Sequence, residues 1–438
     1  MILRKHPYER FVTADGRVRA SSRDGIRSVV FLAAMLATQV AWSQTPPTTN
    51  SPALSTSAAV SEELPSVTVD CDFPGGNIVV DRIEGDHIYV HQDLRDTDRD
   101  WFYWYFRVKG AAGRTLNVHF TDTNVIGGRG PAVSNDSGKS WSWLGVEAVR
   151  DQSFMYQCQP DEAEVRFCFA IPYVQENLDA FLLKYRDHPN LRIASLCQSR
   201  KGRDVTRLHI GRLEGEPKYR VLITCRHHCC EMMASYSLEG LLAAALAESD
   251  YGRWMAENVE LLVVPIMDTD GVAEGDQGKN RTPHDHNRDY SGTSLYPEVK
   301  ALREFVPKWS DGRLQFALDM HDPYIRGESA EIIYLVESDG PTTENVRRFA
   351  RILESTRQGS LPFRASDNMP FGKGWNTSSN YTSGIPFSHW AGALPGIHFA
   401  STVEIPYANV SGRAVTAESA RAFGADVAAA LRVFLDSQ

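Results

Sequence analysis

The stretch Arg226-His227-His228-Cys229-Cys230-Glu231 separates an apolar run at 219–224 from a helical pattern at 232–247. The apolar run predicts a buried strand, and the spacing of the apolar residues after the stretch predicts an amphipathic helix. His228 and Glu231 therefore lie at a strand-to-helix turn. An imidazole and a carboxylate three residues apart at such a turn converge on one ion, and zinc prefers N and O donors of this kind.

Two other interpretations of this stretch stay open. A His-x-x-Glu match is short, and in a chain with 13 histidines it also fits an ordinary turn histidine. Cys225, Cys229 and Cys230 offer a thiolate site instead, although their spacing fits no paired Cys-x-x-Cys pattern. The metal hypothesis therefore needs further candidate ligands that lie near the same turn.

The chain has 438 residues, which is enough for two domains of ordinary size. Its net charge of -9 gives no general attraction to phosphate backbones, so we expect no nucleic-acid partner. The seven cysteines leave one over if an oxidising compartment pairs the others, for example Cys158 with Cys168.

Residues 1–43 predict a signal peptide. Basic residues precede an apolar core at 28–40, and Ala41-Trp42-Ser43 is a small-x-small cleavage site. The core has about 13 residues where a membrane span needs roughly 20, so we expect no stable span, with an uncleaved anchor as the alternative. We therefore expect export, to the periplasm or as a secreted protein. A linker rich in Thr, Ser, Pro and Ala, predicted to be disordered, follows at 44–65.

Two different patterns follow the linker. Short strand-like runs alternate with glycine-rich turns at 66–171, which predicts a small antiparallel β-sandwich. The aromatic run at 101–106 suits a central strand covered on both faces, and core packing is favoured over a carbohydrate-stacking platform. Helices alternate with apolar strands at 172–438, the pattern of an α/β domain. The predicted strands are 66–69, 77–83, 87–91, 101–108, 115–121, 165–171, 205–210, 221–224, 259–266, 314–320, 332–336 and 397–405, and the predicted helices are 177–186, 232–247, 297–306, 343–355 and 417–435.

The α/β pattern tests the metal hypothesis, because reactive groups in open α/β sheets gather beyond the carboxyl ends of strands. His321 directly follows the predicted strand 314–320 and is a natural third ligand. Two His and one Glu with an open fourth position are the ligand set of thermolysin and carboxypeptidase A. Glu404 lies in an apolar segment, where charging it costs free energy; it suits a general base, and a buried ion pair is the alternative.

A polar loop between these strands contains Asp285-His286-Asn287-Arg288. A guanidinium beside an amide makes a fork for a carboxylate, which is the terminal group of a peptide. A loop arginine that caps a helix is the alternative.

In their order along the chain these motifs resemble those of the zinc metallocarboxypeptidases of the M14 family. The matching motifs are His-x-x-Glu, Pro-x-x-x-x-Asp-Gly-Val (265–272), Asp-x-Asn-Arg, Pro-Glu before a helix (297–298), Asp-x-His and Thr-x-Glu. The resemblance implies one zinc ion per chain, held by His228, Glu231 and His321. It also implies that Glu404 is the base and proton shuttle.

The same resemblance implies roles for four further residues. Asn287 and Arg288 would clamp the terminal carboxylate of the substrate. Asp285 would orient a ligand histidine, as metal-bound imidazoles require. Tyr381 resembles the mobile tyrosine that covers the substrate.

The amino-terminal half resembles the cytosolic carboxypeptidase subfamily, in which a β-sandwich precedes the catalytic domain. The matching segments are Phe73-Pro74-Gly75-Gly76-Asn77, 100–108, Ile171-Pro172-Tyr173, 196–199 and Gly202-Arg203. The resemblance runs from about Ser66 to the end of the chain. It implies an α/β fold in which a mixed-sheet catalytic domain at 172–438 follows a sandwich at 66–171. Because the predicted signal peptide indicates export, we expect a bacterial-type variant and not a cytosolic one.

One motif departs from the family. The family has Gly-Asn-x-Arg before Asp-x-Asn-Arg, and its arginine stabilises the oxyanion; the segment here is Gly275-Asp276-Gln277-Gly278-Lys279-Asn280-Arg281. Lys279 and Arg281 each place a positive charge near a developing oxyanion, and the choice between them stays open.

The expected function is hydrolysis of the carboxyl-terminal residue of peptides or proteins. One alternative is a related zinc amide hydrolase that acts on cell-wall peptides or N-acyl amino acids. Another is a catalytically silent binding protein, in which the aromatic sandwich recognises the ligand.

Overall fold

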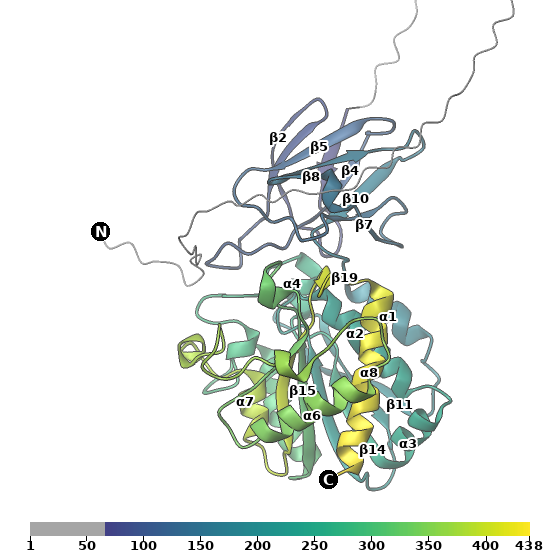
Figure 1. The fold of residues 1–438 in the computed structure, drawn as a ribbon, viewed down its shortest axis with the longest axis vertical. Coiled ribbons are helices and arrows are strands. Elements are labelled where there is room, and N and C mark those ends of the chain that lie inside the picture. The colour runs from purple at the N-terminus through teal and green to yellow at the C-terminus, as the bar shows by residue number, and fades with distance from the viewer. Residues whose placement is uncertain (1–65) are drawn as a thin grey trace, which may run out of the picture. The chain divides into compact units, whose positions relative to one another are not determined.

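The structure, a computed structural model, describes residues 66–438 (Figure 1). The predicted signal peptide at 1–43 and linker at 44–65 lie outside the described residues, so export stays a prediction from the sequence. Within the described range, no helix combines the length and the apolar character that a bilayer crossing requires.

Residues 68–168 form two five-stranded sheets, in the orders β1-β4-β10-β6-β7 and β2-β3-β5-β9-β8. Alternating residues such as Ile88, Val90, Leu116 and Val118 are buried, because successive side chains of a strand point to opposite faces. The predicted sandwich is confirmed, except that β3 and β5 pair in parallel. The strands are β1 (Thr68–Asp70), β2 (Val79–Glu84), β3 (His87–His91), β4 (Tyr105–Lys109), β5 (Thr115–Phe120), β6 (Ala132–Ser134), β7 (Ser142–Trp143), β8 (Val149–Arg150), β9 (Ser153–Gln157) and β10 (Glu164–Cys168).

The aromatic run at 101–106 is only partly a strand. Trp104 and Phe106 are completely buried, so its interpretation as core is confirmed. The predicted strand 101–108 is wrong in its first four residues, since β4 begins at Tyr105. The reason is tertiary: the main-chain N–H and C=O of Tyr103 bond to the side-chain amide of Gln277, at 2.7 and 2.9 Å, instead of to a neighbouring strand.

A mixed seven-stranded sheet with the order β11-β12-β14-β13-β15-β17-β16 organises the rest of the chain. Its four central strands are parallel, and the outer strands pair antiparallel. The predicted mixed α/β fold is therefore confirmed. The strands are β11 (Leu191–Gln198), β12 (Asp204–Gly211), β13 (Tyr219–Cys225), β14 (Val259–Val264), β15 (Leu314–His321), β16 (Tyr334–Val336) and β17 (Phe399–Glu404), and a hairpin of β18 (Asn409–Val410) and β19 (Arg413–Ala414) follows.

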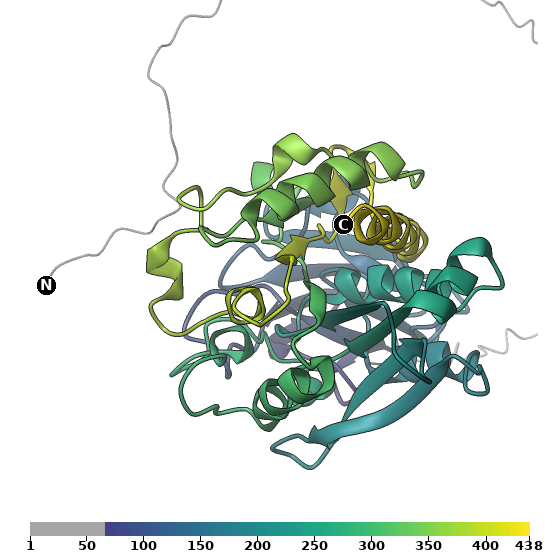
Figure 2. The same cartoon turned by 90° about the horizontal axis from the view of Figure 1, so that it is seen from below.

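Helices cover both faces of this sheet (Figures 1 and 2). In β13, Val221 and Ile223 pack into the core with α2, α6 and α8, whereas Leu222 packs into a second core with α5 and α7. Burial on both faces explains why the central strands are continuously apolar. The helices are α1 (Gln175–Leu183), α2 (Met232–Ala245), α3 (Asp250–Asn258), α4 (Thr269–Glu274), α5 (Pro297–Ser310), α6 (Thr343–Thr356), α7 (Phe387–Gly392) and α8 (Ala417–Asp436).

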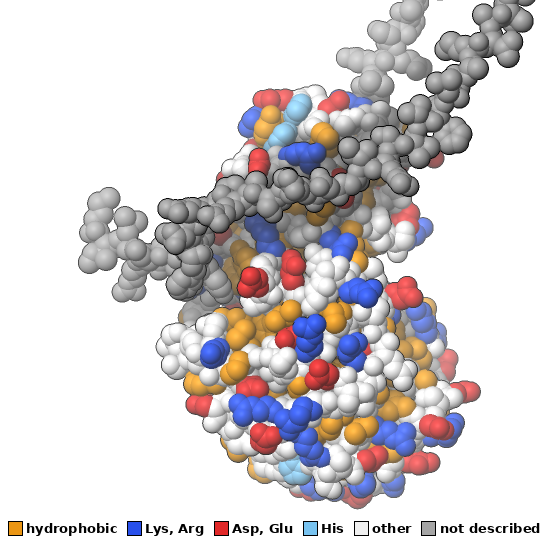
Figure 3. Space-filling view, viewed as in Figure 1, with side chains coloured by type: hydrophobic (Ala, Val, Ile, Leu, Met, Phe, Trp, Pro, Cys, Tyr) orange, Lys and Arg blue, Asp and Glu red, His pale blue; other side chains and the backbone are white. Residues whose placement is uncertain are grey.

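Basic and acidic side chains are interspersed on the face shown in Figure 3. On α6, for instance, Arg347 pairs with Glu337 at 2.8 Å and Arg351 with Glu344 at 3.0 Å. These two arginines are therefore paired with carboxylates.

The parallel pairing of β13, β15 and β17 brings three strand ends together. Cys225 is the register partner of Met320, and His321 is the register partner of Glu404. Side chains at the carboxyl ends of these strands therefore lie next to one another at one edge of the sheet.

The helix α2, which follows the His-x-x-Glu turn, is held against α8 by two glycines. A Cβ atom on Gly240 would lie 1.9 Å from the carbonyl oxygen of Arg421, and one on Gly424 would lie 1.7 Å from that of Ser237. Real Cβ atoms do not approach that closely, so only glycine allows this spacing between the two helices.

We predict that Gly424→Ala destabilises the protein by about 1–3 kcal/mol, because the added methyl group pushes α8 away from α2. Helix propensity alone predicts the opposite sign, since alanine is favoured over glycine by about 1 kcal/mol in a helix interior. Chemical denaturation of both proteins measures the difference.

The matched control is Gly392→Ala in α7, where a Cβ atom meets its nearest neighbour, Ala400 Cβ, at an ordinary 3.5 Å. We expect this variant to be unchanged or up to about 1 kcal/mol more stable. A stabilised Gly424→Ala variant would contradict the helix contact described above.

Candidate active site

The turn after β13 is fixed by Arg226. This residue has a left-handed φ of 61°, and its side chain is buried. The guanidinium donates to the carbonyl oxygens of Cys229 and Tyr173 and to Ser235 Oγ. These bonds hold residues 227–231 in the conformation that turns His228 and Glu231 toward the end of the sheet.

The amino terminus of α2 is capped from another strand. Glu231 occupies the N-cap position, but its side chain makes no capping bond. Asp322, directly after β15, accepts the N–H groups of Met233 and Ala234 at 2.8 Å each. The Glu231 carboxylate is thereby left to face the site.

Two imidazoles and one carboxylate meet at this point. His228 Nδ1 lies 2.9 Å from Glu231 Oε1, and His321 Nδ1 lies 2.7 Å from Glu231 Oε2. Suitable donor atoms of these three residues all lie within 4.8 Å of one another. The structure thus brings together the three residues that the sequence analysis expected to hold a metal.

The donor set fits a divalent metal such as zinc. Two nitrogens and one carboxylate are typical zinc ligands. Glu231 Oε2 is buried and has no hydrogen-bond partner among the described residues, although it lies close to His321. Burial opposes a charge on His321, but Asp319 and Glu231 outweigh it and raise the pKa of its imidazole. The surroundings therefore stabilise positive charge at this position.

A second group of possible ligands consists of His227, Asp319 and His321. It fits a metal less well, because both ring nitrogens of His227 have partners: Asp319 Oδ1 at 2.8 Å and the hydroxyl of Tyr290 at 2.7 Å. His227 is also fully buried. Its contacts suit a residue that supports Asp319.

Asp319 is a functional candidate that the sequence analysis missed. Its Oδ2 lies 2.5 Å from His321 Nε2, on the side of the ring away from Glu231. Burial would raise the pKa of this carboxyl, but His227 and His321 outweigh it and hold the pKa well below its usual value. Asp285 has the corresponding position at the other imidazole, with Oδ1 3.6 Å from His228 Nε2.

Glu404 stands beside the cluster at the end of β17. Its side chain is buried, and Oε2 finds no hydrogen-bond partner in the described part of the chain. Burial raises the pKa of its carboxyl above the usual value, an effect that His321 opposes. The alternative of a buried ion pair has no support in the described residues, since no arginine, lysine or histidine nitrogen lies within 4.0 Å of Glu404, whereas Glu231 has such pairs.

The polar loop at 285–288 reaches the cluster through Asn287. The amide of Asn287 is 3.4 Å from His321 Nε2. The Arg288 guanidinium donates to two main-chain carbonyls, those of Asn287 and Asn380, and lies 5.1 Å from the centre of the Tyr381 ring. Within residues 66–438 no carboxylate pairs with this guanidinium, so its charge remains available to an anion. Burial raises the pKa of Tyr381 to about 12, which keeps its hydroxyl protonated.

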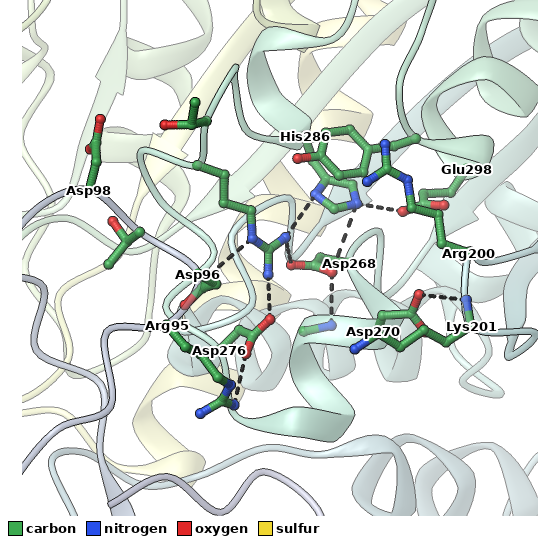
Figure 4. A pocket seen from close by; sticks show the side chains of 15 residues that line it. Arg95, Asp96, Asp98, Arg200, Lys201, Asp268, Asp270, Asp276, His286 and Glu298 are labelled. Carbon is green, nitrogen blue, oxygen red and sulfur yellow. Dashed lines mark hydrogen bonds and ion pairs between the residues drawn. The ribbon is translucent and has the colours of Figure 1, made fainter. Parts of the chain in front are cut away.

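The two cations of the 275–281 segment have different surroundings. Lys279 Nζ lies 2.6 Å from Glu231 Oε1, at the cluster. Arg281 instead pairs with Asp96 at 3.0 Å, Asp268 at 2.6 Å and Asp276 at 2.9 Å. These three carboxylates line a neighbouring cavity of about 420 Å³ (Figure 4). Lys279 is the one of the two that reaches the cluster.

The thiolate interpretation does not fit the structure. All seven cysteines are free, so Cys158 and Cys168 are not paired. Burial raises the pKa of the Cys230 thiol to about 12, and it raises those of Cys225 and Cys229 as well. Neither group of possible metal ligands in the described part of the chain includes a cysteine.

The chain resembles several known proteins in sequence or in fold. No family model matches the chain. A metallo-carboxypeptidase from Burkholderia cenocepacia has a similar structure, with a TM-score of 0.67, 22% identity, and coverage of 85% of this chain and 99% of its own. An uncharacterized protein of Zymomonas mobilis is 25% identical over 58% of this chain and 67% of its own length. Cytosolic carboxypeptidase 6 of Caenorhabditis elegans is 21% identical over 56% of this chain and 59% of its own length.

The fold is similar to that of metallocarboxypeptidases of known structure. The sequence resembles cytosolic carboxypeptidases, as its motifs predicted. The matches span between 28% and 59% of the cytosolic carboxypeptidases concerned.

We predict that Asp319→Asn lowers the affinity for zinc by about 10–100-fold, because a carboxylate that accepts from a ligand imidazole fixes its tautomer and its orientation. Competition with a chromophoric chelator measures the affinity. Asp270→Asn is the control, since Asp270 pairs with Arg203 away from the cluster. Unchanged affinity in Asp319→Asn would exclude this role.

Proposed function

We propose that this chain is a zinc-dependent metallocarboxypeptidase, which hydrolyses the last peptide bond of peptides or proteins with a free carboxyl terminus. The observation that supports this best is the convergence of His228, Glu231 and His321 with Glu404 at the ends of three parallel strands. Resemblance to metallocarboxypeptidases supports the same reaction class.

Zinc bound by His228, Glu231 and His321 would lower the pKa of a water molecule and polarise the substrate carbonyl. Glu404 accepts a proton from the attacking water and donates it to the leaving amine. Its raised pKa suits this exchange, because a general base works best when its pKa lies nearer the operating pH. Its buried Oε2 is available to the reacting groups.

Arg288 and Asn287 bind the terminal carboxylate of the substrate. The guanidinium has no carboxylate partner within the described range, and a fork of N–H donors matches a carboxylate. Tyr381, whose ring lies against Arg288, covers the bound residue. Binding the carboxylate at a fixed place sets which peptide bond lies at the metal.

Lys279 stabilises the oxyanion. Its ammonium group lies at the cluster, where a positive charge favours the negative charge that develops on the carbonyl oxygen. Burial acts to lower the pKa of Lys279, but Glu231 and Glu404 outweigh it and raise the pKa, so the group is charged. Arg281 is proposed for a structural role instead, since three carboxylates occupy its guanidinium.

We expect the purified mature chain to contain about one zinc ion and to cleave peptides with free carboxyl ends but not their amidated counterparts. Arg288→Ala should raise KM for the free peptides by at least about tenfold, the usual worth of a hydrogen bond to a charged group. Elemental analysis and a peptide library with matched free and amidated ends provide the measurements.

Arg351→Ala, on the exposed face of α6, serves as the control. It should change neither the KM for free peptides nor the zinc content. Cleavage of both sets of peptides, together with an unaffected Arg288→Ala variant, would favour the amide-hydrolase alternative. A chain that binds no zinc would refute the proposal.

We predict that Glu404→Gln loses at least about 100-fold in kcat and keeps its zinc, because the amide retains the shape of the side chain but cannot transfer the proton. Steady-state kinetics and elemental analysis of the same preparation give both values. Glu344→Gln, an exposed substitution on α6, controls for the change of charge. Near-normal turnover would remove Glu404 from the reaction.

A further inference from the structure

The segment 275–281, which carries Lys279, is bound by residues of the β-sandwich. Asn77 donates to the carbonyl oxygen of Gly275 at 2.7 Å. The side-chain amide of Gln277 bonds to both main-chain groups of Tyr103. These contacts join parts of the chain that are more than 170 residues apart.

Asp96 makes three further contacts with the segment. Its Oδ1 accepts the N–H of Gln277 at 2.9 Å, and its Oδ2 accepts the N–H of Gly278 at 2.8 Å and Arg281 Nε at 3.0 Å. The carboxylate thus holds the segment on both sides of Lys279. Because these bonds involve a charged acceptor, they are among the stronger ones in a protein.

The opposite side of the segment lies against the His-x-x-Glu turn. Gly278 has a left-handed φ of 79°, and a Cβ atom there would lie 2.5 Å from the main-chain nitrogen of Cys229. Asn280 also has a left-handed φ, of 51°. The segment is therefore confined between Asp96 and the turn, which leaves its backbone little freedom.

Trp101 of the sandwich contacts the side chain of Lys279 itself. The Lys279 ammonium lies 5.1 Å from the centre of the Trp101 ring, and Trp101 Nε1 donates to Asn280 Oδ1 at 3.1 Å. At its other contacts the ammonium meets Glu231 and the carbonyl oxygen of Asp322. An aromatic face on one side and two oxygens on the other determine where the charge lies.

Arg281 connects this arrangement to the catalytic region. Asp96 and Asp268 pair with the same guanidinium, and Asp268 also accepts the N–H of Gly271 in α4 (Figure 4). Several buried charges are therefore satisfied together only when the sandwich segment is in place.

We propose that Asp96 is a positioning residue for Lys279, so that the amino-terminal sandwich takes part in the proposed reaction by fixing the oxyanion-stabilising charge. This inference rests on the proposed function, in which Lys279 acts on the transition state.

The test is a double-mutant cycle of Asp96→Asn and Lys279→Ala, with peptide hydrolysis and zinc content measured for each protein. We expect Asp96→Asn to lower kcat about 10–100-fold while KM stays within about threefold, because the displaced charge acts mainly in the transition state. The double variant should be no slower than Lys279→Ala, since Asp96 acts through Lys279.

Asp98→Asn is the matched control on the same sandwich segment, because its carboxylate is largely exposed and its nearest cation, Arg99, lies 3.9 Å away. It should keep full activity. If Asp96→Asn does not fold, as judged by circular dichroism, Trp101→Phe replaces it in the cycle. Trp101→Phe removes the bond to Asn280 but keeps an aromatic ring, so we expect it to lower kcat less than Asp96→Asn does. In a chain that already has Lys279→Ala, Trp101→Phe should lower kcat no further.

Multiplicative losses in the double variant would overturn the inference, because they would show that Asp96 acts independently of Lys279. Wild-type kcat in Asp96→Asn would overturn it as well. Failure of the proposed function has a different signature: the wild-type chain hydrolyses no peptide, or Lys279→Ala alone keeps wild-type turnover.

Discussion

The buried carboxylate of Glu231 is the constraint on which the site depends. A carboxylate that is 1% exposed is costly unless positive groups compensate it, and His228, His321 and Lys279 all approach within 3 Å. Each imidazole in turn has its own carboxylate on the far side, Asp285 for His228 and Asp319 for His321. Negative Glu231 is therefore surrounded by imidazoles and an ammonium group, and each imidazole has a second carboxylate beyond it. The charge of each group is stabilised by the oppositely charged group next to it.

Because the Glu231 carboxylate faces the site, it does not cap the helix α2 that follows it. A residue at the N-cap position usually bonds its own helix, but Glu231 does not, so Asp322 at the end of β15 supplies the acceptor. The same strand end thus provides a candidate ligand, His321, and the cap of the helix that follows Glu231. The glycine contact between α2 and α8 keeps this helix at the required distance. Strand pairing, helix capping and helix packing together determine the distance between Glu231 and His321.

Much of the fold could be predicted from the sequence, because the central strands are continuous apolar runs and the long helices have a regular apolar spacing. The short helices α4 and α7, six residues each, give too little periodicity to be recognised. Asp319 had a usable signal: residues i and i+2 of a strand share a face, so the Asp-x-His spacing places this carboxylate beside His321. Asp96 had none, because its partners lie about 180 residues further along the chain. The choice between Lys279 and Arg281 was likewise undecided, since it depends on partners from other elements.

The chemistry of the two cations explains why the segment 275–281 uses both. A guanidinium presents a planar set of five donors, and Arg281 uses it to join Asp96, Asp268 and Asp276. An ammonium group is a compact charge on a flexible stem, and Lys279 extends it to Glu231. An arginine at 279 would bring a larger group to a position that is already bounded by Trp101 and Asp322, and a lysine at 281 would have too few donors in a fixed geometry to join the three carboxylates. The two cations of the segment therefore have different roles. Arg281 joins the sandwich to the catalytic region through its ion pairs, and Lys279 places a positive charge beside the proposed reacting groups.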